Sequence, residues 1–131
     1  LARIVFADPE ERVYLEELLH PHIIDAIMLK VARLQDEGKE IVFVEAALLF
    51  ESGLDEKFDE VWLVQAKPEQ QLNRLLDNRD YDPQEARQRI EAITPLDEDE
   101  LMECKCIDNS RTLQYTFQQI EKLLREIGHN L

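Results

Sequence analysis

The chain has 131 residues, of which 44% are hydrophobic, and its 29 acidic residues exceed its 15 lysines and arginines to give a formal net charge of −14. A chain of this length folds as one domain, and its acidic balance argues against partners that need a basic surface, such as nucleic acids and anionic membranes. No segment has the roughly 18 to 20 apolar residues that cross a bilayer, and no secretion signal is recognisable, so the sequence predicts a soluble cytoplasmic domain.

The order of the predicted helices and strands indicates an α/β fold with parallel strands. Asp8-Pro9, followed by acidic residues, is typical of a helix start, and apolar residues at helical spacing continue after His20-Pro21 as far as Gly38. Continuous apolar runs are typical of strands buried on both faces of a parallel sheet. We expect helices over 9–19 and from 22 to Gly38, strands over 41–44 and 61–64, a helical hairpin over 68–78 and 83–93, a strand over 104–107 and a helix over 112–127.

The glycines of the chain do not form a phosphate-binding motif. Only three are present, Gly38, Gly53 and Gly128, and they lie too far apart for G-x-x-x-x-G-K-[ST] or G-x-G-x-x-G. These 131 residues therefore contain no glycine-rich loop that could cradle a phosphate.

The predicted hairpin holds the main group of cationic side chains in this acidic chain. Guanidinium groups suit phosphate recognition because their planar forks bind two oxygens at once. The alternative is ordinary pairing on a helix surface, since Glu85 and Arg89 are four residues apart. Composition by itself favours surface pairing for the four arginines, which are Arg74, Arg79, Arg87 and Arg89.

Three other features have a functional and a structural interpretation. Glu45 follows a predicted strand. A carboxylate at that place can orient a substrate hydroxyl or hold Mg²⁺ through water, and the structural alternative is an acidic residue that merely ends the strand. Cys104 and Cys106 would share one face of a strand. We interpret them as small buried residues, which is favoured over the alternative that they form half of a metal site. His20 and His22 do not share a helical face, which argues against a metal pair.

Taken in order, short segments along nearly the whole chain resemble the dephospho-CoA kinase family of P-loop kinases. The matching N-terminal segments are Leu1-Ala2-Arg3-Ile4-Val5-Phe6, Arg12, Leu15-Glu16, His20-Pro21, Ala47-Leu48-Leu49-Phe50-Glu51-Ser52-Gly53 and Phe58-Asp59. The matching C-terminal segments are Gln71-Leu72-Asn73-Arg74, Arg79-Asp80, Ala86, Arg89-Ile90 and Ile107-Asp108-Asn109. Their order and spacing are more specific than any one of them.

The resemblance implies a division of labour along the chain. It makes 7–38 a helical CoA-binding part, 67–96 a lid that closes over ATP, and 39–66 with 103–131 the core. Arg74 and Arg79 would neutralise the transferring phosphates, and Asn109 would lie beside the adenine. His20 and Glu45 would lie on the side of dephospho-CoA, whose 3′-hydroxyl receives the γ-phosphoryl group of ATP with Mg²⁺.

The family's first βα unit, with its glycine-rich P-loop, has no counterpart in these residues. We therefore expect this chain to be an incomplete form, inactive by itself. Several positions also differ from the family pattern, including Ala47, Ile93 and Cys104. A non-catalytic acidic interaction or regulatory module on a kinase-derived scaffold is the alternative, and another small-molecule kinase with a similar lid is a third interpretation.

Overall fold

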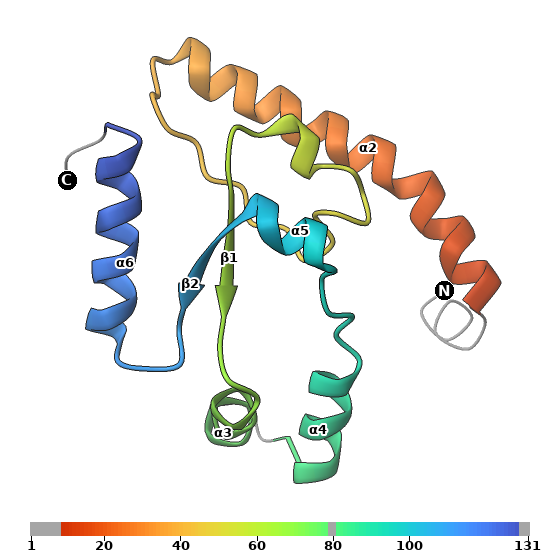
Figure 1. Ribbon diagram of the computed structural model, residues 1–131. Coiled ribbons are helices and arrows are strands. Elements are labelled where there is room, and N and C mark those ends of the chain that lie inside the picture. The colour runs from red at the N-terminus through yellow and green to blue at the C-terminus, as the bar shows by residue number, and fades with distance from the viewer. Residues whose placement is uncertain (1–8, 79–80, 129–131) are drawn as a thin grey trace. The chain divides into compact units, whose positions relative to one another are not determined.

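The computed structural model describes residues 9–78 and 81–128, which divide into two compact units that meet in sequence after Lys57 (Figure 1). The first unit contains the long helix α2 (Pro9–Asp36) and the 3-10 helix η1 (Asp55–Lys57). The second unit contains, in chain order, β1 (Val61–Gln65), α3 (Pro68–Asn78), α4 (Pro83–Glu91), α5 (Glu98–Glu103), β2 (Cys104–Asp108) and α6 (Leu113–Glu126).

Helix α2 is continuous, and the predicted break at His20-Pro21 is wrong. Its 28 residues include Pro21 in the interior. A proline there lacks one hydrogen bond to the carbonyl four residues earlier, but its fixed φ is compatible with a helix. Once a helix has formed on one side of such a residue, propagation adds a hydrogen bond for each further residue, so one missing bond need not end it.

The predicted stop at Gly38 is confirmed. The Gly38 N–H donates to the Gln35 carbonyl at 2.9 Å, and the Lys39 N–H donates to the Leu34 carbonyl at 3.0 Å. This pair of bonds is typical of a helix end at which one residue adopts the left-handed conformation. That residue is Gly38, whose φ is 81°. A glycine adopts this conformation without the steric penalty of a Cβ atom.

The predicted strand over 41–44 is not formed. Residues 41–46 have no regular secondary structure, and the side chain of Phe43 is 65% exposed. An apolar run becomes a strand only when a neighbouring strand takes its backbone hydrogen bonds, and in the part of the chain that the structure describes β1 and β2 pair only with each other. A turn follows this segment, with the Gly53 N–H bonded to the Phe50 carbonyl at 3.0 Å.

Strands β1 and β2 form a parallel pair, as predicted. Val61 lies opposite Cys104 at one end of the pair, and Gln65 lies opposite Asp108 at the other. Helix α6 packs against β2, where Ile107 is only 1% exposed. Because the strands are parallel, their carboxyl ends lie at one edge, and the chain continues from that edge into α3 and α6 (Figure 1).

The cysteines do not fit the expectation of small buried residues. Cys104 is half-buried and Cys106 is exposed, and neither forms a disulfide. Alternate residues of a strand point to opposite faces, so both cysteines lie on the face opposite to Ile107. Helix α6 therefore covers the isoleucine and leaves Cys106 in solvent.

Helices α3 and α4 pack against each other as the predicted hairpin. The second of them begins as the Asp-Pro pattern predicts, because the Asp82 side chain accepts hydrogen bonds from the N–H groups of Gln84 and Glu85. Ala86 on α4 is fully buried, and α3 and α4 are in contact with each other.

Candidate functional site

The loop that follows β2 is fixed to the end of β1 by hydrogen bonds. The Asn109 N–H donates to the Gln65 carbonyl at 2.7 Å, and the Lys67 N–H donates to the Ser110 hydroxyl oxygen at 2.8 Å. The carboxylate of Asp108 accepts from the Ser110 N–H at 2.8 Å. Hydrogen bonds from the Ser110 hydroxyl and backbone N–H lower the pKa of Asp108, with a smaller contribution from Arg111. The loop is thus held as a charged turn at the carboxyl edge of the sheet.

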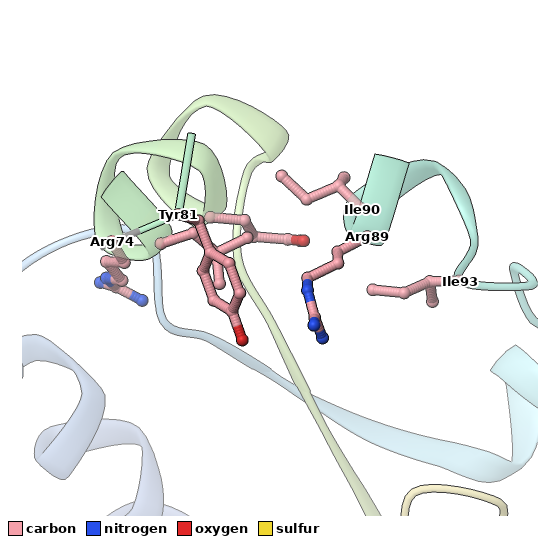
Figure 2. A pocket seen from close by; sticks show the side chains of 7 residues that line it. Arg74, Tyr81, Arg89, Ile90 and Ile93 are labelled. Carbon is pink, nitrogen blue, oxygen red and sulfur yellow. The ribbon is translucent and has the colours of Figure 1, made fainter. Parts of the chain in front are cut away.

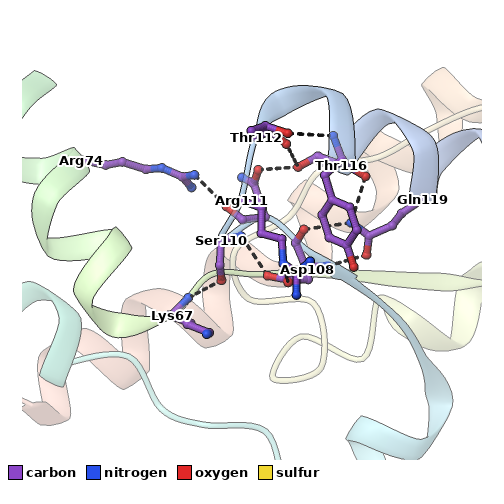
Figure 3. A network of polar contacts seen from close by, with 10 residues as sticks. Lys67, Arg74, Asp108, Ser110, Arg111, Thr112, Thr116 and Gln119 are labelled. Carbon is purple, nitrogen blue, oxygen red and sulfur yellow. Dashed lines mark hydrogen bonds and ion pairs between the residues drawn. The ribbon is translucent and has the colours of Figure 1, made fainter.

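Helix α6 holds the same loop from the other side (Figure 3). The Gln119 side chain accepts from the Asp108 N–H at 2.9 Å and donates to the Asp108 carbonyl at 2.9 Å. The buried Thr116 hydroxyl donates to the Asn109 side-chain oxygen at 2.9 Å. Gln119 therefore takes the place of the backbone partners that the strand loses at Asp108, and Thr116 holds the side chain of Asn109.

Arg74 reaches this loop from α3. Its Nη2 donates to the Asn109 carbonyl at 2.7 Å, and the side chain is half-buried (Figure 3). The start of α3 is also held to the end of the preceding segment, because the side-chain amide of Gln71 donates to the Ala66 carbonyl at 2.6 Å. The structure thus joins two residues, Arg74 and Asn109, that sequence reasoning assigned to one site.

A cavity of about 570 Å³ opens between α3 and α4 (Figure 2). It is lined by Gln71, Arg74 and Leu75 on α3, by Tyr81, and by Arg89, Ile90 and Ile93 on and after α4. The guanidinium carbon of Arg89 lies 4.5 Å from the centre of the Tyr81 ring. Three of the lining side chains are aliphatic and two are cationic, an arrangement suited to an anionic ligand with an apolar surface.

Of the other three predicted site residues, two belong to the first unit and one is not described. Arg79 lies outside the described residues. His20 is half-buried within α2, and Glu45 is exposed in the irregular segment of the first unit, so the strand end that was expected to place it is absent. Sequence reasoning missed Gln119 and the ring of Tyr81, because neither belongs to a motif and their partners lie eight or more positions away.

Within residues 9–78 and 81–128, no group of three or more acidic, histidine or cysteine side chains is placed to hold a metal ion. The described helices include none that is both long and apolar enough to cross a membrane. The site is therefore built from hydrogen-bonding and cationic groups at the sheet edge and in the hairpin.

Comparison with known proteins identifies the family. A dephospho-CoA kinase family model matches residues 1–114. The dephospho-CoA kinase of Symbiobacterium thermophilum is 40% identical over 125 residues, covering 95% of this chain and 52% of the relative. That of Listeria monocytogenes is 32% identical over 130 residues, covering 99% of this chain and 65% of the relative.

A solved structure supports the predicted fold class. The crystal structure of TT1252 from Thermus thermophilus matches with a TM-score of 0.74 at 29% identity, covering 96% of this chain and 64% of that one. The α/β fold with a parallel sheet, of the P-loop kinase type, is confirmed. The chain spans about half to two thirds of the length of the relatives that it matches. Because the family model covers most of the chain and the relatives align over nearly all of it, the chain belongs to the dephospho-CoA kinase family.

Proposed function

We propose that this protein transfers the γ-phosphoryl group of ATP to the 3′-hydroxyl of dephospho-CoA, which gives coenzyme A. The observation that carries the proposal is the contact between Arg74 and Asn109 at the carboxyl edge of the parallel strands. Ligands of open α/β sheets bind at this edge. The identity of the substrates is inferred from the family to which the chain belongs. The contact supports the proposal because it places a cation and a polar loop where a nucleotide would bind.

The side chains of the lid would act mainly by electrostatics. Phosphoryl transfer needs positioning and neutralisation of charge more than covalent chemistry. Arg74 would contact the transferring phosphates, with Arg79 as its partner by resemblance. The Asn109 loop would lie beside the adenine, and His20 and Glu45 would lie on the dephospho-CoA side.

The parts of the chain follow the same proposal. We assign 67–96 to the lid over ATP, 7–38 to binding of dephospho-CoA, and 39–66 with 103–131 to the core. The described residues do not by themselves fit a metal ion. Mg²⁺ usually keeps waters and substrate phosphates as most of its ligands, so it would enter with ATP.

The test is the conversion of dephospho-CoA and Mg²⁺-ATP to coenzyme A by the complete gene product that contains these residues, followed by mass spectrometry of the product. We expect a mass increase of one phosphoryl group on dephospho-CoA and one ADP for each coenzyme A. Binding of both ligands without any product would instead support the non-catalytic interpretation.

A second arm uses residues 1–131 alone. These residues contain no G-x-x-x-x-G-K-[ST] motif, so we infer that they do not catalyse the transfer by themselves. Calorimetric titration with Mg²⁺-ATP should show weak binding, and tight binding would contradict the role given to the missing phosphate cradle.

A further inference from the structure

The cavity between α3 and α4 contains a second arginine to which neither the family resemblance nor the proposed function gives a task. Arg74 and Arg89 line the cavity from facing helices, and the described lining includes no carboxylate. This is unusual in a chain with 29 acidic residues and a net charge of −14. A cavity with two cations and no acid among its lining residues attracts an anion.

Tyr81 holds the guanidinium of Arg89. In the view of Figure 2 the ring stands between the side chains of Arg74 and Arg89, and the Arg89 guanidinium carbon lies 4.5 Å from the ring centre. A guanidinium that stacks on a ring uses its flat face for that contact and leaves its in-plane N–H groups for oxygen acceptors. The ring therefore orients Arg89 and does not occupy its donors.

The ion pair with Glu85 does not account for Arg89. The nearest oxygen is 3.7 Å from Nη2, beyond hydrogen-bond distance, and the two side chains are 55% and 46% exposed. Exposed pairs of this kind contribute little to stability. The surface pairing that composition favoured is present but weak, and the contact with Tyr81 turns the side chain to the cavity that Arg74 also lines.

We propose that Arg89, positioned by the ring of Tyr81, is a second phosphate-contacting side chain of this cavity and binds the triphosphate of ATP together with Arg74. The inference rests on the proposed function because it takes ATP as the anion. Two guanidinium forks on facing helices bind several oxygens of a phosphate chain at once, which a single arginine does not. The cavity volume of about 570 Å³ is in the range of small-molecule sites.

The experiment measures the affinities for ATP, adenosine and dephospho-CoA by calorimetry on the complete gene product. Arg89→Ala should weaken ATP binding about tenfold, the loss of one partly exposed charge-assisted hydrogen bond. The affinities for adenosine and dephospho-CoA should stay within about twofold of those of the parent protein, since this side chain binds neither ligand in the proposal. Arg87→Ala is the matched control, because Arg87 is exposed on the same helix and does not line the cavity.

Two substitutions of Tyr81 test its positioning role. Tyr81→Phe keeps the ring and should keep the affinity for ATP, whereas Tyr81→Leu removes the ring and should weaken ATP binding about threefold, with adenosine unaffected. If the ring had a purely structural role, Tyr81→Leu would weaken the binding of ATP and of adenosine equally, and that result would contradict the positioning role.

The outcomes separate this inference from the proposed function. If coenzyme A is made and Arg89→Ala binds ATP as tightly as the parent protein, or loses ATP and adenosine equally, the inference is wrong and the function stands. A loss confined to dephospho-CoA also overturns it. If no coenzyme A is made but ATP binding depends on Arg89, the proposed function fails and the inference stands. Absence of ATP binding overturns both.

Discussion

Replacement of Arg74 by alanine should reduce phosphoryl transfer far more than it reduces stability. The substitution removes one hydrogen bond, from Nη2 to the Asn109 carbonyl at 2.7 Å, in a half-buried setting. Such a bond to a charged group contributes about 1 to 2 kcal/mol, and 1 kcal/mol lowers the melting temperature of a domain of this size by about 3 to 6 °C. The lost stabilisation of the transition state corresponds to about 10² to 10³ in kcat.

The assay is the kcat of the complete gene product with saturating Mg²⁺-ATP and dephospho-CoA, measured below the unfolding transition of the variant and beside a thermal melt of the same protein. Arg87→Ala is the matched control and should change neither quantity. A kcat within about threefold of the parent value would refute the assignment of Arg74 to the phosphates. A loss of activity in proportion to the unfolded fraction would show that Arg74 only holds the loop.

Three further predictions concern stability. Ile107→Ala removes a side chain that is 1% exposed between β2 and α6, and should lower the free energy of unfolding by about 2 to 4 kcal/mol in urea titrations. Thr116→Val removes the hydroxyl bonded to Asn109 and should lower it by about 1 kcal/mol in the same titrations, with no change in the slope. Glu60→Gln removes the negative charge of the nearer of the two carboxylates that pair with Lys105, and its effect in thermal melts should vary with pH.

The sign of that pH dependence follows from both partners. The Lys105 ammonium at 2.6 Å and the Trp62 N–H hold the pKa of Glu60 below its ordinary value of 4.5, so its contribution is present above 4.5 and is lost as the pH falls through the lowered pKa. Glu60 raises the pKa of Lys105 above 10.5, so that contribution is lost at still higher pH. The melting temperatures of the parent protein and of Glu60→Gln should therefore differ most between these two pH limits. A difference that persists in strong acid would contradict the stabilising role of the Glu60 charge.

Local signals predicted the second unit well because its elements carry their own start and stop chemistry. Asp82 before Pro83 caps α4 as predicted, and the apolar run at Val61 forms β1 beside β2. Arg74 and Asn109 lie 35 positions apart and still meet, because parallel strands bring both segments to one edge. The family resemblance, and not the local patterns, was what assigned both residues to ATP; the parallel strands explain why they meet.

The errors arise where structure depends on a partner that a local pattern does not contain. The run at 41–44 has the composition of a strand, but no neighbouring strand is present to accept its hydrogen bonds in the described part of the chain. Pro21 looked like a helix end because the prediction weighed its missing N–H and not the cooperativity of the turns on either side. Exposure of Cys106 depends on which face of β2 is covered by α6, which alternation alone does not determine.

Arg74 serves the loop and the proposed phosphate site without conflict because of the chemistry of its side chain. A guanidinium has five N–H donors in a plane, and the Asn109 carbonyl uses one of the donors on Nη2. The other donors are left for phosphate oxygens on a side chain that lines the same cavity as Arg89, so a phosphate would add to the bond with the loop and would not compete with it. A lysine carries its donors on one nitrogen at the end of a flexible stem and cannot hold both partners in a fixed geometry. The contact that holds the loop at the edge of the sheet would thus also orient the cation for the proposed phosphate ligand, so a single arginine would link the stability of the loop to the proposed chemistry.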